Sequence, residues 1–326
     1  MTGIIDTLLK SDEPSVRWKV RTQVLGEDPD SPAIRTLRGE IRRSPRARAL
    51  IDGQAAENRG TYVKWTGRHW VLIALADLGY PPGDPELVPV AEKTMKTWLA
   101  ATYFTEYETN RRETGRAGVP VMRGRHRRCA SQQGGALLAA VRLGLVPDDT
   151  DRLVERLLHW QWPDGGWNCD RQPKAESSSV GETLLPMRGL AAYAHERKDR
   201  AAQAAAERAA EVFLTRRVLY HRSNGKPIRD AWFKLNYPSY WYYDVLSATK
   251  GLMEVGRLDD PRAQAGLDVL ESKRLPDGGW PAEARHYRSS GQSGIDLVGW
   301  GGISASKSNE WITADALAVM TAAGRL

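Results

Sequence analysis

The chain has very little of several residue types. Its 326 residues include two cysteines and three phenylalanines. Two cysteines cannot build a disulfide framework and are typical of a reducing compartment, so we expect a cytoplasmic protein. The first residues, MTGIIDTLLKSDEPSVRW, have an early acidic side chain and no apolar stretch of signal-peptide length. No window approaches the ~20 apolar residues of a membrane span. These absences exclude a secreted disulfide scaffold and an integral membrane protein.

Two features are abundant instead, namely large aromatic side chains and arginine. Twelve Trp and eleven Tyr outnumber Phe, and the formal net charge is +7. Trp and Tyr combine apolar bulk with a polar group and suit the wall of a cavity. Residues 111–128, RRETGRAGVPVMRGRHRR, contain seven arginines and one acid. We interpret this segment either as a solvated loop or as a surface for phosphates, nucleic acid or an anionic membrane.

Two kinds of predicted helix alternate along the chain. Residues 83–99, 148–161 and 259–273 are amphipathic and begin at or beside an aspartate that suits an N-cap. They predict outer helices with one buried face. Five other segments are apolar or small almost all round, which predicts buried inner helices. These are 69–79, 134–145, 178–194, 240–256 and 311–324.

A turn sequence recurs at a fixed spacing. WQWPDGGWNCD at 160–170 returns as KRLPDGGWPAE at 273–283, and Asp52-Gly53 precedes the first copy by the same interval. The two intervals are 112 and 113 residues, and the turns Thr109-Asn110 and Asn224-Gly225 fall roughly midway in them. A helix pair therefore repeats about every 56 residues, as in solenoids and closed helical rings. We predict an all-α protein whose residues 51–326 form an α/α toroid of about five to six inner and outer helix pairs. Residues 1–50 are expected to form a helical segment or cap that packs on this barrel.

The two Pro-Asp-Gly-Gly-Trp runs are interpreted first as structural corners. Glycine reaches a positive φ without a steric penalty, so Asp-Gly-Gly suits a tight turn after an outer helix. The ring of Trp167 is then expected to pack across the corner, and Gln161 to bind backbone groups at a helix end.

The stretch LHWQWPDGGW, Leu158 to Trp167, resembles the QW repeat of squalene–hopene cyclases and oxidosqualene cyclases. The β subunits of protein prenyltransferases carry a related turn. The second copy departs from the repeat, because Arg274 stands where the glutamine belongs. The resemblance implies an α/α toroid whose cavity opens at the N-terminal ends of the inner helices. In these families the cavity binds long isoprenoids, which react through carbocations between aromatic walls.

The catalytic motifs of these families do not carry over. The cluster Asp148-Asp149-Thr150-Asp151 differs from the Asp-x-Asp-Asp motif of the cyclases, and we interpret it as the start of an outer helix. Arg152 breaks an Asp-Asp-x-x-Asp motif. The order Cys169-Asp170 does not match the Asp-x-Cys zinc motif of prenyltransferases. The chain is also about half as long as a two-domain triterpene cyclase, so we expect a lone toroid.

Candidate site residues are concentrated where loops enter the predicted inner helices. The acids Asp170, Asp244 and Glu310 are the candidate catalytic groups, since a carboxyl beside aromatic rings can donate a proton or stabilise a cation. The structural alternatives are that Asp244 binds a neighbouring loop and that Glu310 is a first-turn residue favoured by the helix dipole, with Ser308 or Asn309 as the N-cap. The predicted substrate-binding residues are Tyr62, Trp65, His69, Trp167, Tyr240, Tyr243, Trp311, Arg125 and Arg128.

A metal site is a further hypothesis. Cys129 and Cys169 occur at the same point of successive repeats, and with His126 or His69 they could bind Zn²⁺. No ligand spacing in the sequence supports this site, and two inert buried cysteines are the alternative. The sequence requires no cofactor, and Zn²⁺ and Mg²⁺ both stay open.

Two functions follow from these observations. The first is a cyclase- or prenyltransferase-like enzyme that acts on a hydrophobic or isoprenoid-type small molecule with acid assistance. The alternative is a non-catalytic toroid that binds a lipid, a peptide or another anionic ligand. Nucleic-acid binding is disfavoured because no recognisable module is present. Peripheral contact with a membrane and the oligomeric state stay open.

Overall fold

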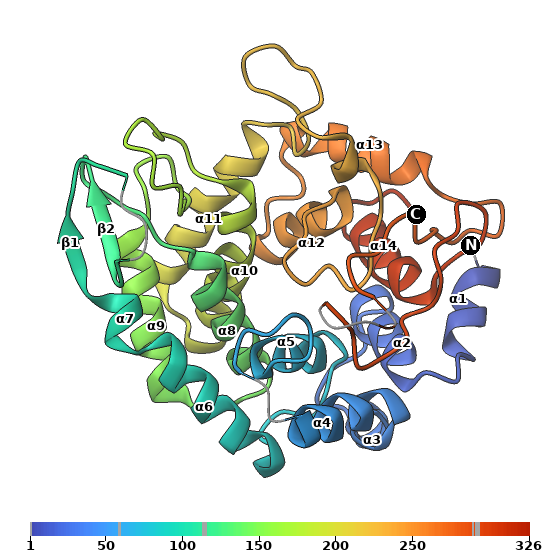
Figure 1. Ribbon diagram of the computed structural model, residues 1–326. Coiled ribbons are helices and arrows are strands. Elements are labelled where there is room, and N and C mark those ends of the chain that lie inside the picture. The colour runs from blue at the N-terminus through green and yellow to red at the C-terminus, as the bar shows by residue number, and fades with distance from the viewer. Residues whose placement is uncertain (1, 58–59, 113–115, 289, 291–293) are drawn as a thin grey trace.

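The computed structural model describes residues 2–57, 60–112, 116–288, 290 and 294–326, and this part of the chain is mostly α-helical (Figure 1). Its helices are α1 (Thr2–Leu9), α2 (Pro14–Lys19), α3 (Pro32–Arg43), α4 (Pro45–Glu57), α5 (Arg68–Asp77), α6 (Val88–Trp98), α7 (Ala101–Phe104), α8 (Ala130–Arg142), α9 (Pro147–Trp160), α10 (Val180–Arg197), α11 (Arg200–Leu214), α12 (Val245–Val255), α13 (Gln264–Ser272) and α14 (Glu310–Ala322). A π-helical turn, η1 (Val20–Val24), follows α2, and short 3₁₀ turns are η2 (Pro85–Leu87), η3 (Asp230–Phe233) and η4 (Pro261–Ala263).

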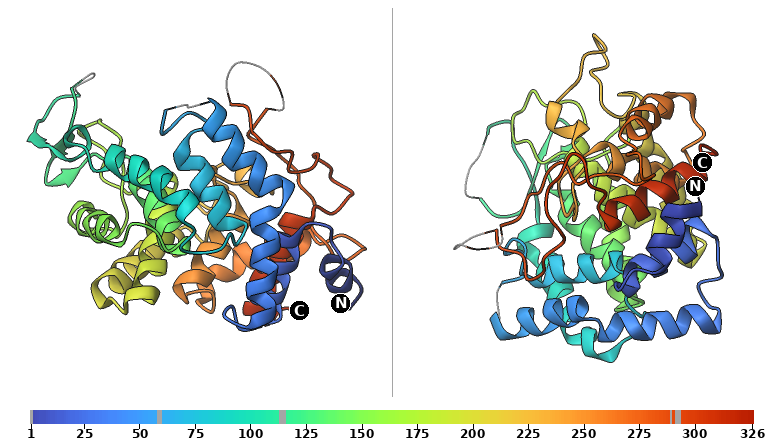
Figure 2. Two further views of the ribbon diagram at one scale, coloured as in Figure 1. Left: turned by 90° about the horizontal axis from the view of Figure 1, so that it is seen from below. Right: turned by 90° about the vertical axis from the view of Figure 1, so that its right-hand side faces the viewer.

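The five predicted inner helices are present as α5, α8, α10, α12 and α14. Each packs against the next, so that α5 contacts α8, α8 contacts α10, α10 contacts α12, and α12 contacts α14. Small residues permit the closest of these approaches, because a Cβ atom added at Gly189 of α10 would lie 2.7 Å from the carbonyl oxygen of Gly134 in α8. The helix α14 in turn packs against α2, which brings the beginning and the end of the chain together (Figures 1 and 2).

The amphipathic helices pack on the outside of this group. The helix α9 packs against α8, α11 against α10, and α13 against α12. Only one face of each is buried, which in α9 consists of Thr150, Leu153, Val154, Leu157 and Trp160. The predicted contrast between one-sided outer helices and fully buried inner helices is therefore confirmed. The alanine-rich helix α11 was not anticipated.

Part of the arginine-rich segment belongs to a small sheet, so the all-α prediction is corrected to a mostly α fold. Strand β1 (Glu106–Glu108) pairs in parallel with β2 (Val119–Met122), and β2 pairs antiparallel with β3 (Arg125–His126). The sheet lies at one edge of the molecule, outside the helices (Figure 1). The interpretation of residues 111–128 as a plain solvated loop is therefore wrong for the part that forms these strands.

The two Pro-Asp-Gly-Gly-Trp runs form equivalent corners. Trp167 is 1% exposed, and its Nε1 donates a hydrogen bond to the carbonyl oxygen of Leu157 at 3.0 Å. Trp280 is 0% exposed and donates in the same way to Leu270 at 2.7 Å. Each indole thus satisfies a carbonyl of the preceding outer helix while it fills the corner. This is a structural role, as predicted.

The side chain at the Gln position closes the same turn in both corners. Gly165 has a φ of +96°, and its carbonyl oxygen accepts a hydrogen bond from Nε2 of Gln161 at 2.7 Å. In the second corner Arg274 replaces the glutamine, and its Nε donates to the carbonyl oxygen of Gly278 at 3.3 Å. The guanidinium supplies the donor that the glutamine amide supplies in the first copy, so the corner is kept although the motif is not.

Candidate functional site

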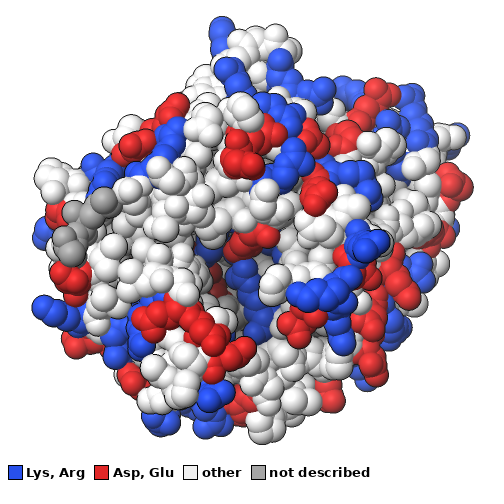
Figure 3. All heavy atoms as spheres, turned by 180° about the vertical axis from the view of Figure 1, so that it is seen from behind, with Lys and Arg blue, Asp and Glu red and all other residues white. Residues whose placement is uncertain are grey.

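A cavity of about 50 Å³ lies between the inner helices. Part of its wall is apolar, formed by Ile73, Leu138, Leu185 and Leu246 among others, and part is charged, formed by Asp77, Arg142, Arg188, Lys250 and Asp315. Figure 3 shows the molecule from behind, where a hollow near the middle of this face contains basic and acidic side chains. The side chain of Arg142 is 28% exposed, so solvent reaches the charged wall.

Four charged side chains form a closed ring beside this cavity. Nζ of Lys19 lies 2.7 Å from Asp77 and 2.9 Å from Asp315. Nζ of Lys250 lies 3.1 Å from Asp77 and 2.8 Å from Asp315. Each ammonium group therefore contacts both carboxylates. The hydroxyl of Tyr237 donates a further hydrogen bond to Asp77 at 2.8 Å.

The ring is assembled from four helices that are distant in sequence, α2, α5, α12 and α14. Burial disfavours the charged form of Lys19, but the carboxylates of Asp315 and Asp77 outweigh it and raise the pKa of this lysine. Burial also disfavours the charged form of Lys250. At this residue the carboxylates of Asp315 and Asp77 do not outweigh burial, so the pKa of Lys250 is lowered. The pKa of Asp77 is lowered against the effect of burial by Lys19 and Lys250. These groups stabilise one another's charges at a place where Lys19, Lys250 and Asp315 have almost no contact with solvent.

A second charged group lies at the C-terminal ends of the inner helices. Glu254 accepts hydrogen bonds from Nε of Arg188 at 2.7 Å and from Arg142 at 2.8 Å. Burial opposes ionisation of Glu254, but Arg142 and Arg188 lower its pKa well below the ordinary value. Among the described residues Arg142 donates to Glu254 alone, although a guanidinium carries five N–H groups. The guanidinium of Arg142 therefore has N–H groups that no described acceptor of the protein uses.

Asp244 is the one predicted catalytic acid on the cavity wall. It is the N-cap of α12, and its carboxylate accepts hydrogen bonds from the backbone N–H of Ser247 at 2.7 Å and from the backbone and side-chain nitrogens of Asn236, both at 2.8 Å. Burial raises its pKa to about 6, although these hydrogen bonds act in the opposite direction. Residues 234–243, called the 236 loop below, precede α12. The contact of Asp244 with this loop matches the alternative that Asp244 binds a neighbouring loop.

The other two predicted acids lie elsewhere. Asp170 is exposed, and its carboxylate accepts a hydrogen bond from the backbone N–H of Gln172 in a surface turn. Glu310 is exposed at the first position of α14 and accepts a hydrogen bond from the hydroxyl of Ser11 at 2.9 Å. Neither belongs to the cavity wall. The structure does not bring the three acids into one site.

The predicted aromatic wall is largely a packed plug. The rings of Trp65 and Tyr240 stack with centroids 4.5 Å apart, and Tyr237 stacks on Trp311 at 5.2 Å. The hydroxyl of Tyr243 donates to the carbonyl oxygen of Val218 inside the core. Of the predicted aromatic residues only Tyr240 lines the cavity. Trp65, Trp311 and Tyr243 each contact another aromatic ring, as expected for aromatic surface that gains by packing.

His69 and Tyr62 also belong to aromatic packing. Nε1 of Trp98 donates a hydrogen bond to Nδ1 of the fully buried His69 at 3.3 Å, and burial lowers the pKa of this histidine to about 3. Tyr62 is half-buried and lies edge-on to Trp98, with centroids 5.4 Å apart. His69 is therefore a neutral core histidine. Among the described residues, the group of possible metal ligands that contains both cysteines does not include His69.

The two predicted binding arginines lie against aromatic rings outside the cavity. The guanidinium of Arg125 lies 5.8 Å from the ring centre of Trp162. Arg128 is buried, lies 4.7 Å from the ring centre of Tyr103, and donates a hydrogen bond to Gln132 at 2.6 Å. Their charges are used in cation–π contacts near the sheet. Neither belongs to the cavity wall.

The candidate metal ligands separate into two groups. The thiols of Cys129 and Cys169 do come together, and with a carboxylate oxygen of Glu182 their ligand atoms lie within 4.8 Å of one another. Cys169 donates to Glu182 at 3.4 Å, and a hydrogen bond from Cys169 lowers the pKa of Cys129. His126 is not part of this group and lies beside Glu106. The third ligand suggested by sequence is therefore replaced by Glu182.

The sequence reasoning missed most of the charged groups at the cavity. A signal for them was present, since Asp77, Arg188, Lys250 and Asp315 are among the few charged residues in segments that are otherwise mostly apolar or small. A charge in a helix that is buried all round must meet a partner from another helix. Lys19 had no such signal, because α2 is short and not apolar.

No protein-family model matches the chain, and a search among curated proteins also found no match. The resemblance to the cyclases therefore depends on the corner motifs described above. In the described part of the chain no helix is both long and apolar enough to cross a membrane.

Proposed function

We propose that this chain is an α/α toroid that binds a small amphiphilic molecule in its central cavity, with an anionic group at Arg142 and a hydrocarbon part against the apolar wall. The alternation of inner and outer helices and the two QW-like corners support the toroid. The cavity itself supports the ligand class, because Ile73, Leu138, Leu185 and Leu246 adjoin a charged wall. An isoprenoid diphosphate has this combination of properties.

The surplus of cationic donors is the observation that carries the proposal. Each of the cavity carboxylates Asp77, Asp244 and Asp315 accepts at least two hydrogen bonds or ion pairs from the protein. Arg142, by contrast, has N–H groups left over and is partly exposed. A guanidinium binds phosphate and carboxylate oxygens through paired hydrogen bonds. An anionic group is therefore favoured over a cation at this wall.

The proposal reverses the orientation expected from sequence. The sequence analysis placed the predicted binding residues, Arg125 and Arg128 among them, where loops enter the inner helices. Arg142 is the last residue of α8, and Asp77 is the last residue of α5, so the charged wall lies toward the opposite ends of these helices. At the entrances, the 236 loop and its stacked rings fill the space instead.

Replacing Arg142 by glutamine is expected to weaken binding of geranyl diphosphate at least tenfold, since a charge-assisted hydrogen bond contributes about 1.5–3 kcal/mol. Isothermal titration calorimetry measures this with the wild type and the variant. Inorganic diphosphate and geraniol are titrated in parallel and are each expected to bind more weakly than geranyl diphosphate, since each lacks one half of the ligand.

Arg125→Gln is the matched control, because this arginine lies outside the cavity and its loss should leave the affinity unchanged. Equal affinity of wild type and Arg142→Gln, together with a loss in Arg125→Gln, would place the anionic group at the entrances and contradict the proposal. Failure of the wild type to bind any of the three probes at millimolar concentration would also count against it.

An acid-assisted enzyme is a second candidate function, favoured by the position of Asp244 on the cavity wall and by its raised pKa. A carboxyl with a pKa of about 6 keeps its proton to a higher pH than an exposed one. If Asp244 donates a proton to a bound isoprenoid, turnover should decrease as the pH rises through about 6, because the acid form is lost.

Turnover is expected to be abolished in Asp244→Asn while geranyl diphosphate still binds. Product formation from a panel of isoprenoid diphosphates, measured by mass spectrometry between pH 5 and 8, tests this. Unchanged turnover in the variant would assign Asp244 to capping of α12 alone.

A further inference from the structure

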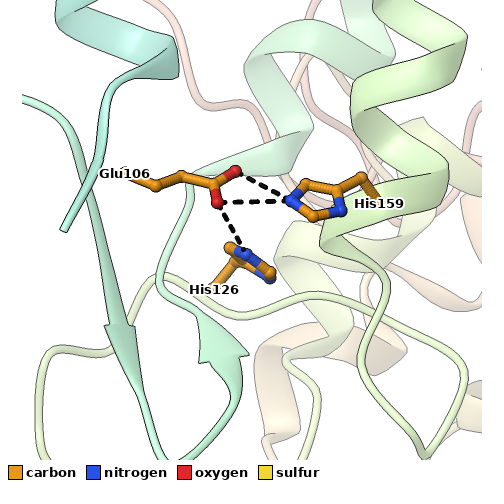
Figure 4. A group of neighbouring side chains, drawn as sticks. All are labelled: Glu106, His126 and His159. Carbon is orange, nitrogen blue, oxygen red and sulfur yellow. Dashed lines mark hydrogen bonds and ion pairs between the residues drawn. The ribbon is translucent and has the colours of Figure 1, made fainter. Parts of the chain in front are cut away.

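A cluster of two histidines and a glutamate lies between the small sheet and α9. Nε2 of His126 is 3.2 Å from Oε2 of Glu106, and Nε2 of His159 is 3.0 Å from Oε1 of the same carboxylate (Figure 4). These ligand atoms all lie within 4.8 Å of one another. Both imidazoles thus direct a nitrogen toward one carboxylate, and the three potential metal-ligand atoms converge on one point.

The three residues are held by different elements. Glu106 is the first residue of β1, His126 belongs to β3, and His159 is in the last turn of α9. The pairing of β1 and β3 with β2 fixes the first two relative to each other. The position of the third follows from the corner that ends α9. The cluster is therefore assembled by tertiary structure and is not visible as a spacing in the sequence.

Hydrogen bonds from two tryptophans hold the cluster from outside. Nε1 of Trp160 donates to Oε1 of Glu106 at 3.0 Å, which orients the carboxylate. Nε1 of Trp162 donates to the backbone carbonyl of His126 at 2.8 Å, which fixes the strand that carries this histidine. Support of this kind keeps metal ligands in place and tunes their basicity.

We propose that Glu106, His126 and His159 bind one divalent transition-metal ion, with Zn²⁺ as the favoured ion. Imidazole nitrogen and carboxylate oxygen are its usual ligands, and three protein ligands leave a fourth position for water or another oxygen ligand. The side chain of His159 is 51% exposed, so solvent has access to that position. The site is separate from the cavity and does not depend on the function proposed for it.

The distances suit this ion. Zn²⁺ binds histidine nitrogen at about 2.0–2.1 Å and carboxylate oxygen at about 2.0–2.2 Å, so ligand atoms at tetrahedral angles lie roughly 3.4 Å apart. The two nitrogen-to-oxygen distances here are 3.2 Å and 3.0 Å. A small outward movement of the side chains admits the ion, and the exposed His159 can make it without repacking the core. A bound ion would then tie the sheet to α9.

Titration of the metal-free protein with Co²⁺, followed by visible absorption, tests the proposal. The double variant Cys129→Ser/Cys169→Ser serves as the parent, so that the cysteine group cannot bind the ion. One Co²⁺ per chain is expected, with the absorption of a four- or five-coordinate ion. In this parent His159→Gln and Glu106→Gln should each lower the affinity at least tenfold. Zn²⁺ should raise the Tm of the parent but not of these variants.

His195→Gln is the matched control, since His195 is an exposed histidine near the end of another helix, α10, and its loss should leave the affinity unchanged. The proposal is overturned if His159→Gln and Glu106→Gln bind Co²⁺ as tightly as the parent, or if the parent binds neither Co²⁺ nor Zn²⁺ at millimolar concentration. If the double cysteine variant does not fold, the wild type is used, and a strong near-ultraviolet sulfur-to-cobalt band would assign the ion to the cysteines instead.

Discussion

Replacing Trp167 by alanine is expected to reduce the free energy of unfolding by about 3–5 kcal/mol, the usual cost of truncating a large buried aromatic residue. The indole is 1% exposed and fills the corner between α9 and α10. Its loss leaves a cavity and also leaves the carbonyl oxygen of Leu157 without its donor. Urea unfolding followed by circular dichroism gives the difference between wild type and variant.

The equivalent residue provides a matched comparison. Trp280→Ala should cost a similar amount, because Trp280 makes the same contact with Leu270 in the second corner. Trp241→Ala is the control for loss of an indole, since Trp241 is only half-buried and should cost clearly less. A Trp167→Ala protein with an unchanged midpoint of unfolding and weakened binding of geranyl diphosphate would mean that this corner belongs to the ligand site.

Replacing Lys19 by methionine is expected to destabilise the protein by about 3–5 kcal/mol, although methionine has a similar volume. The ammonium group has no exposed surface and contacts both Asp77 and Asp315. Its removal leaves the buried carboxylate of Asp315 and the partly exposed carboxylate of Asp77 to share Lys250, and an unbalanced buried charge is far more costly than the pair it replaces. Lys93→Met, on the exposed face of α6, is the control and should change stability by less than ~0.5 kcal/mol.

A double variant separates charge balance from packing. Lys19→Met combined with Asp315→Asn removes one charge of each sign from the ring, so it should be more stable than Lys19→Met alone. The two substitutions then do not add, as expected for groups in direct contact. Additive losses, measured by the same urea unfolding, would show that the ring acts through its volume and not through its charges.

Most of the secondary structure follows from local patterns in the sequence. The inner helices are apolar over consecutive turns, the outer helices repeat apolar residues on one face, and the corners carry Gly-Gly between them. Each of these patterns spans fewer than about twenty residues. Helix geometry decides which side chains share a face, and the hydrophobic effect decides which face is buried. The small sheet was missed because its strands are only two to four residues long, and two of them, β2 and β3, lie within an arginine-rich stretch.

The environment of the aromatic residues could not be predicted from local sequence patterns. Trp65, Tyr240 and Trp311 were predicted to line a cavity, because aromatic side chains at helix entrances can do so. Whether such rings face a space or one another depends on how the entrance loops fold over the helices. The 236 loop inserts Tyr237 against Trp311, and Tyr240 against Trp65, so the rings form a plug.

The sequence alone determined where the five inner helices and three of the outer helices occur, and where the two Gly-Gly corners turn the chain. Only the tertiary structure decided which charges meet. Lys19 and Asp315 are 296 residues apart and share a hydrogen bond, and Glu106 meets both His126 and His159. No spacing encodes these contacts, because they arise from helices and strands that come together only when the apolar faces pack. The chemistry of the cavity and of the proposed metal site is set at that step, by the cost of burying each charge without a partner.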